Sequence, residues 1–367
     1  IYQKHTFSTY ASAQHIVRNS YYSAYGMTTD FTGVLGAQYI YHFDKCLFMP
    51  ADLTGGIEFN HDNLHDKATD VQKYRDAALA EDPTATGDRL QQLIEKYTPA
   101  PLNQVVNIAS VYAQNEWKNE QWSFLIGGRV DIRYNPTQDV NIRFSYAEGF
   151  RAPQAFDEDL HISNVGGELV SIVRAKGLKE ERSRSFNASV DWYHYFGDFQ
   201  ANLLVEGFYT KLSDPFVLTP PVKDPDGSAY LIQTRINGSG AKVYGGTLEG
   251  KVAYKDKVQL QAGLTLQRSI YDSPEEWSAD EEHLSEKERY SDKILRTPDV
   301  YGYFTATYMP VKAFSIALNG NYTGRMYVPH LLSEVNGEAD VLVKSPDFFE
   351  LGTKIAYDFD FQGFCLQ

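Results

Sequence analysis

The chain has 367 residues and a formal net charge of −14, because 34 lysine and arginine residues stand against 48 aspartate and glutamate residues. This acidic balance argues against a nucleic-acid-binding protein, which needs a basic face. The 2 cysteines, Cys46 and Cys365, exclude a disulfide-dense scaffold or a cysteine-built zinc module, and no stretch approaches the roughly 18 apolar residues of a transmembrane helix.

Apolar and polar residues alternate along most of the chain. The alternation is clearest in Leu47–Asn60, Val140–Phe150, Phe186–Trp192, Phe199–Tyr209, Tyr244–Tyr254, Val258–Leu266, Val300–Tyr308, Phe314–Tyr322 and Phe349–Phe359. A period of two is typical of a strand with one apolar face. About fourteen such strands can be drawn and a fifteenth begins at the C-terminal end, so the sequence predicts an all-β, antiparallel protein.

The connections indicate which face of the sheet is buried. Short connections lie at 44–46, 118–121, 135–139, 197–198, 255–257 and 310–312, and long ones alternate with them at 61–104, 151–182, 212–229, 273–293 and 329–345. Outer-membrane barrels have short periplasmic turns and long extracellular loops, whereas a soluble sandwich has no reason to sort loop length by end. We therefore expect a transmembrane antiparallel β-barrel, with apolar side chains facing lipid.

Aromatic residues flank nearly every short turn. They include Tyr41, Phe43, Trp117, Trp122, Tyr195, Phe196, Phe199, Tyr254, Tyr308 and Phe314. Aromatic residues are common in strands of any kind, but here they gather at one end of each strand. This placement favours a girdle at the periplasmic membrane interface.

Three places depart from this regular pattern. The segment 122–134 lies between two short turns of the same side, so two strands are needed there, and we expect a hairpin tip to be missing near Asp131–Ile132. The start of the chain lacks the regions of a signal peptide and its end stops as a new alternating run begins, so we expect a fragment. Within 70–100, helical patterns at 71–80 and 87–97 predict a short helical insertion in one extracellular loop, either a lid over the barrel mouth or a solvated decoration.

The loops show no catalytic constellation, so we expect no enzyme. His61 and His65 have metal-ligand spacing but lie at a strand end, where a surface pair is the simpler interpretation. The acidic stretch 272–292 offers oxygen ligands for calcium but lacks the calcium-loop pattern, which favours a solvated loop. No resident cofactor is expected; a metal chelate or Ca²⁺ would be bound as a ligand.

Three motifs resemble those of TonB-dependent outer-membrane receptors. Tyr146–Gln154, with the letters YAEGFRAPQ, is similar to the family signature Y-x-x-G-F-R-A-P. Gly177–Ser183 is similar to the family's N-P-x-L-K-P-E-x-S, with Gly177 and Glu180 departing from it. Asn237–Glu249 resembles a third, glycine-containing strand motif. The resemblance covers 146–249 in motifs and the whole chain in its rhythm of strands and loops.

The resemblance implies a part of a 22-stranded barrel, of which residues 1–367 would supply about 14–15 strands, without the plug, the TonB box and the last strands. It implies import of a ferric siderophore, haem or cobalamin across the outer membrane of a Gram-negative bacterium, with energy from the TonB–ExbB–ExbD complex acting through the absent plug. Outer-membrane lipid and a surface lipoprotein are further candidate partners.

Several loop residues are candidate ligand contacts. They are Arg151, His161, Tyr271, Tyr290, Tyr327 and His330. His161 lies between the first two motifs, where haem receptors of the family tend to carry a histidine. Two alternatives stay open from the residues alone: a passive porin-like channel without a plug, and a surface β-sheet binding protein whose apolar residues meet in a dry interior.

Overall fold

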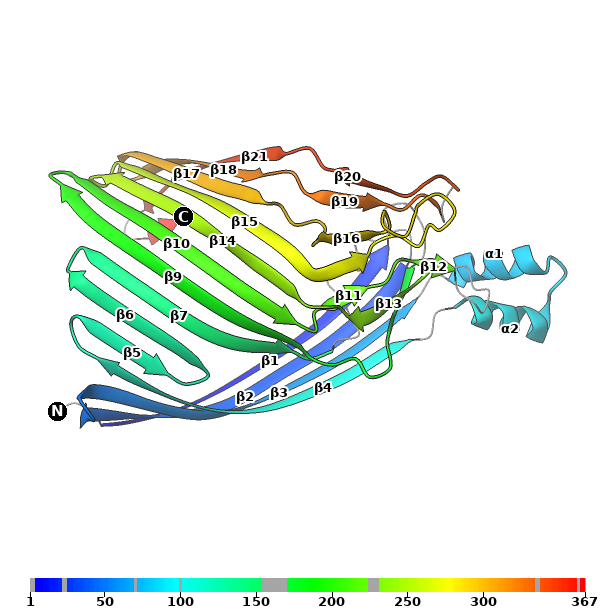
Figure 1. Ribbon diagram of the computed structural model, residues 1–367, viewed down its shortest axis with the longest axis horizontal. Helices are drawn as coiled ribbons and strands as arrows, with labels where there is room; N and C mark the ends of the chain where they lie inside the picture. The colour runs from blue at the N-terminus through cyan, green and yellow to red at the C-terminus, as the bar shows by residue number, and fades with distance from the viewer. Residues whose placement is uncertain are drawn as a thin grey trace.

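The computed structural model describes residues 4–21, 25–68, 71–98, 101–153, 170–223, 231–333, 337–361 and 364–366. Most of this chain forms one strongly curved, 15-stranded antiparallel sheet (Figure 1). Neighbours in the chain are neighbours in the sheet, in the order β1-β2-β3-β4-β5-β6-β7-β9-β10-β14-β15-β17-β18-β21, and β16 pairs with β15. The predicted all-β fold with about fourteen or fifteen strands is therefore confirmed.

The strands of the main sheet have the following bounds: β1 His5–Tyr21, β2 Tyr25–Cys46, β3 Met49–Ala68, β4 Leu102–Lys118, β5 Trp122–Ile126, β6 Arg129–Thr137, β7 Val140–Arg151, β9 Glu181–Phe196, β10 Phe199–Ser213, β14 Ala241–Tyr254, β15 Val258–Glu276, β16 Tyr290–Lys293, β17 Val300–Val311, β18 Phe314–Thr323 and β21 Phe348–Tyr357. Smaller sheets contain β8 Val170–Arg174, β11 Phe216–Leu218, β12 Val222–Lys223 and β13 Leu231–Asn237; β19 Tyr327–His330 and β20 Val341–Lys344; and β22 Phe359–Phe361 with β23 Phe364–Leu366. In Figure 1 the short turns gather at one end of the sheet and the long connections at the other.

The apolar face of the main sheet is uncovered. Leu203, Val205, Leu248 and Leu260 keep between 40% and 52% of their surface exposed. Within the described residues, the few buried apolar side chains lie mainly in the loops and helices, and they form no core against the sheet. A soluble sandwich would bury these rows in its interior, so the exposed rows fit a face that meets hydrocarbon.

Two rows of aromatic side chains bound this apolar face. The row nearer the long connections, which we call the outer row, runs in register across four strands and consists of Tyr146, Phe186, Tyr209 and Tyr244. The row nearer the short turns, which we call the inner row, consists of Phe196, Phe199, Tyr254 and, on the strand beyond Val258, Tyr308. The rows are ten residues apart on β9, β10 and β14. At about 3.4 Å per residue and a tilt of about 40°, ten residues rise roughly 26 Å, the height of the apolar band of an outer-membrane barrel.

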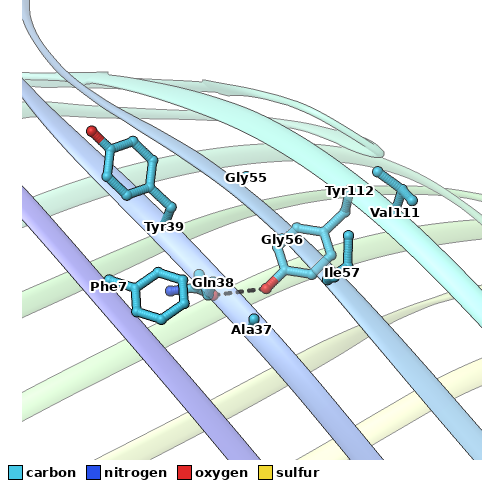
Figure 2. A pocket seen from close by; sticks show the side chains of 9 residues that line it. All are labelled: Phe7, Ala37, Gln38, Tyr39, Gly55, Gly56, Ile57, Val111 and Tyr112. Carbon is cyan, nitrogen blue, oxygen red and sulfur yellow. Dashed lines mark hydrogen bonds between the residues drawn. The ribbon is translucent and has the colours of Figure 1, made fainter.

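Tyrosines on the opposite, polar face lie across glycines of the neighbouring strand. In register, Tyr112 on β4 faces Gly56 on β3, and its hydroxyl donates to Gln38 on β2 at 2.8 Å (Figure 2). A Cβ at Gly56 would lie 2.4 Å from Cζ of Tyr112. The absence of a side chain at Gly56 therefore lets one ring join three strands. On the opposite face of the sheet, Phe7 on β1 lies across from Tyr39 on β2, and both belong to the apolar face (Figure 2).

The hairpin formed by β5 and β6, which lies between β4 and β7 in the sheet, is short. The chain turns at Gly127–Gly128, where the N–H of Gly127 donates to the carbonyl of Arg129 at 2.9 Å, and not near Asp131–Ile132 as expected. Two strands do occupy 122–134, but β5 pairs with β4 only from Asn115 to Lys118. In the described chain, residues 102–114 of β4 pair with β3 alone. That outer residues are missing from this hairpin stays a prediction.

The two predicted helices, α1 Val71–Glu81 and α2 Gly87–Tyr97, are present in the connection between β3 and β4. They pack on each other through Ala78 and Leu93, and in Figure 1 they project beyond the sheet rather than across its mouth. This placement agrees with the solvated decoration and not with the lid. No helix in the described residues is long and apolar enough to cross a membrane.

Candidate ligand-binding face

The first two motifs meet at the loop end of the sheet. Arg151 ends β7 and Glu181 begins β9, and the register places them directly opposite each other. A guanidinium nitrogen of Arg151 lies 3.4 Å from the Glu181 carboxylate, which also accepts the backbone N–H of Phe216 at 3.0 Å. The Arg151 guanidinium lies 4.9 Å from the centre of the Phe216 ring. Glu181 therefore fastens the start of the 214–240 connection to the rim of the barrel.

The third motif fastens the same region from the other side. The Asn237 side chain accepts the backbone N–H of Lys179 at 2.9 Å and donates to the carbonyls of Lys179 at 3.1 Å and Asp214 at 2.8 Å. Strand β13, which ends at Asn237, pairs with β11 and β12 and lies parallel to β8 of the preceding loop. The motif residues thus join two long loops into one small sheet.

Tyr271 lies near this cluster, three residues beyond the outer aromatic row on β15. Its side chain is half-buried on the polar face. Burial raises the pKa of Tyr271, and the negative charges of Glu275 and Glu181 raise it further. Tyr271 is therefore a neutral hydrogen-bonding group at neutral pH, close to the Arg151–Glu181 pair.

A second cluster joins the connections that precede β17 and β21. Asp280, 4% exposed, accepts the backbone N–H groups of His283 at 3.0 Å and Asp340 at 3.0 Å. Asp340, 2% exposed, accepts the Ser278 hydroxyl at 2.6 Å and the backbone N–H groups of Leu332 at 2.7 Å and Ser333 at 2.8 Å. These two carboxylates hold the two loops together.

Burial of Asp280 opposes its charge, but bonds from the backbone outweigh burial. The N–H groups of Asp340 and His283, with the His283 ring, hold the pKa of Asp280 below its usual value. The sequence placed Asp280 in a solvated acidic stretch, and that interpretation is wrong for this residue. Nothing in the sequence singles out its partner 60 positions away, since Asp340 carries no motif.

The remaining candidate contacts are spread over the loop end. Tyr290 on β16 is 39% exposed and lies opposite Glu276. Tyr327 on β19 lies 5.1 Å from the Lys344 ammonium, and His330 at the end of the same strand is exposed. His161 lies outside the described residues. The structure therefore brings Arg151 and Tyr271 into one neighbourhood, around Glu181, and places Tyr290, Tyr327 and His330 on other connections.

No metal centre forms among the described residues, where groups of three or more potential ligands are absent. His61 and His65 lie on the outer face, and each bonds the asparagine opposite it on β4, Asn107 and Asn103. Asp62 between them points to the other face because strand residues alternate.

The polar face carries its own balanced charges. Asp191, only 6% exposed, lies 3.8 Å from the Arg143 guanidinium and accepts the Tyr193 hydroxyl at 2.9 Å and the Asn202 amide. These residues come from β7, β9 and β10. Such a hydrogen-bonded wall suits a wet interior, and together with the bounded apolar face it defines a membrane-spanning β-barrel with its long loops at one mouth.

Comparison with known proteins identifies the family. The model described as TonB dependent receptor-like, beta-barrel, matches residues 2–364, so the chain belongs to the β-barrel domain of the TonB-dependent receptors. This assignment confirms the outer-membrane location and agrees with the expectation that the chain is not an enzyme. No curated protein matches the sequence significantly.

Solved structures share the fold at low identity. The FrpB iron transporter from Neisseria meningitidis (F3-3 variant) is 12% identical with a TM-score of 0.54, and the match covers 98% of this chain and 57% of FrpB. The siderophore receptor PirA from Acinetobacter baumannii is 13% identical with a TM-score of 0.55, covering 98% and 57%. The copper transporter OprC is 11% identical with a TM-score of 0.56, covering 96% and 54%. The chain thus spans about half the length of these proteins.

Proposed function

We propose that this chain is the barrel wall of an outer-membrane receptor that imports a scarce metal chelate with energy from TonB. The observation that carries the proposal is the assembly of the loop end: three family motifs converge on Glu181 and Asn237 and fix long loops above a polar-walled barrel. Rigid loops at the mouth can bind a large solute before it passes the barrel. The iron, siderophore and copper transport named for the structural neighbours favours a ferric siderophore over haem or cobalamin.

The proposed ligand contacts are Arg151, His161, Tyr271, Tyr290, Tyr327 and His330. Arg151 keeps 55% of its side chain exposed beside the Glu181 carboxylate, so its charge remains available to an anionic chelate. Tyrosine hydroxyls such as that of Tyr290 can donate to chelate oxygens. The TonB–ExbB–ExbD complex would act through a plug, with a surface lipoprotein as a further candidate partner.

A deletion strain tests the proposal. It should lose growth on one ferric chelate, haem or cobalamin source and regain it with the full-length gene, while uptake stops in a strain that lacks TonB. Arg151→Ala should reduce uptake of that solute more than Arg89→Ala, whose arginine lies on the projecting helix α2. Uptake that continues without TonB would instead support the passive channel, and normal growth of the deletion strain on every source would refute import of these solutes.

A further inference from the structure

A row of cations crosses the outward face of the barrel beside the outer aromatic row. Lys211 on β10 lies directly opposite Arg184 on β9 and Lys242 on β14. We call these three residues the basic row. Each is two residues beyond an aromatic residue of the outer row, on the same face of its strand. Arg268 on β15 lies opposite Tyr244, and so takes an aromatic place in that outer row.

The charges of the basic row are incompletely balanced. Like charges directly opposite in a sheet are destabilising, yet three cations stand in register here. Glu148 lies 3.1 Å from Arg184, and the Asp272 carboxylate bonds the Lys211 ammonium and lies 3.4 Å from that of Lys242. Arg268 is exposed and shows no ion pair with a described residue. Four cations therefore face two carboxylates, in a chain whose net charge is −14.

The height of the row matches lipid headgroups. Two residues rise roughly 5 Å along a tilted strand, so the cations lie about 5 Å beyond the aromatic girdle, where phosphates rather than acyl chains are found. Below them the apolar face is continuous through Val205 and Leu248. We propose that the basic row and Arg268 bind the phosphates of an anionic outer-leaflet lipid whose acyl chains lie on this apolar face.

The position of Asp272 shows that the row accepts an oxyanion. Its two carboxylate oxygens each approach one lysine, in the way that phosphate oxygens would. Cations near an anionic membrane surface gain from that charge, whereas the same cations against a neutral surface would not. The site concerns how the barrel is held in its membrane and does not depend on the imported solute.

The experiment measures lipid binding by the full-length receptor in a neutral detergent. The probes are diphosphoryl lipid A, the same lipid without phosphates, and inorganic phosphate. Native mass spectrometry measures how much of each probe the receptor retains, and the melting temperature measures how much each probe stabilises it. We expect tight retention of the diphosphoryl lipid only. The triple variant Arg184→Gln/Lys211→Gln/Lys242→Gln should weaken retention about 10-fold or more, whereas Lys255→Gln/Lys257→Gln/Lys312→Gln, at the opposite end of the barrel, should leave it unchanged.

A variant that should strengthen lipid retention distinguishes the loss of a lipid site from simple misfolding. Asp272→Asn frees both lysines, so it should strengthen retention of diphosphoryl lipid A, although it removes two ion pairs from the protein. Equal loss in both triple variants, or weaker retention in Asp272→Asn, would overturn the proposal. Full competition by inorganic phosphate at the same concentration would also overturn it, because the site would then recognise soluble phosphate without a lipid.

Discussion

Three tyrosines on the polar face reach across a glycine to a third strand. Tyr303 on β17 faces Gly263 on β15 and donates to Glu249 on β14. Tyr10 on β1 lies opposite Gly36 on β2 and donates to Glu58 on β3 at 2.5 Å. Tyr112 makes the third such contact, across Gly56. Each tyrosine thus couples strands that are not themselves paired. The glycines are visible in the sequence, but their role depends on register, which alternation alone does not determine.

We expect Gly263→Ala to destabilise the barrel. The new methyl would lie 2.6 Å from Cε1 of Tyr303, so the ring must leave Glu249, at a cost of about 1–3 kcal/mol in the free energy of unfolding. The matched control is Gly250→Ala on the outer face of β14, where nothing lies within 4 Å and the change should be neutral or slightly stabilising. Urea titration of the receptor in lipid vesicles measures both. Equal stability of the two variants would contradict a packing role for the Tyr303 ring.

The Asp280 carboxylate makes the contact between two loops dependent on pH. Its folded-state pKa is lowered, so its ionised form contributes stability above the unfolded value of about 4, and this contribution is lost as pH falls through the lower folded value. We expect proteolysis of the 277–289 and 331–345 segments to accelerate below about pH 4. Asp280→Asn should accelerate it already at neutral pH, whereas Glu286→Gln, at an exposed position of the same loop, should not. Cleavage of the wild-type loops that is independent of pH would contradict this assignment.

At the scale of elements, alternation predicted the strands and the face of each residue. Where alternation stops, a 3.6-residue pattern placed α1 and α2 to within one residue, because that period is distinct from two. The interlocking of the loops could not be predicted, because Asn237 and Lys179 are 58 positions apart and join through backbone groups that every residue has. For the same reason the sequence suggested Arg151 and Tyr271 separately but not their shared neighbour Glu181.

The short hairpin β5–β6 leaves a testable mark on β4. Alternate amides of a strand point to opposite neighbours, and residues 102–114 of β4 have a partner only in β3. We therefore expect hydrogen exchange in 102–114 to alternate, with every second amide slow and the others fast. Residues 115–117 pair with both β3 and β5, so their exchange should not alternate in this way; Lys118 pairs with β5 alone. Uniform protection along 102–114 would mean that another segment occupies this edge.

At the scale of the whole molecule, the overall composition gives no sign of a membrane protein, whereas the side chains of the sheet do so once they are sorted by face. The chain is acidic and lacks an apolar run, yet its leucines and valines gather on one uncovered face between two aromatic rows. The inner row could be predicted, because short turns mark it. The outer row was missed, although its spacing of ten residues from the inner one on β9, β10 and β14 is present in the sequence. The sequence says least about where solute binds, because the six proposed ligand contacts lie at three separate connections, β7–β9, β15–β17 and β18–β21.

The position of the membrane can be tested by placing a charge at different points of β10. Val205 lies on the apolar face between the two aromatic rows, six residues beyond Phe199 and four before Tyr209, and 50% of its surface is exposed. Val205→Arg should cost about 2–4 kcal/mol of folding free energy in lipid vesicles, because arginine at the midplane must leave water. Leu204→Arg, one residue away on the polar face, should cost far less, and Tyr209→Arg at the girdle about 0–1 kcal/mol. Equal costs at 204 and 205 would show that both faces of the strand meet the same surroundings, which a membrane-spanning barrel does not allow.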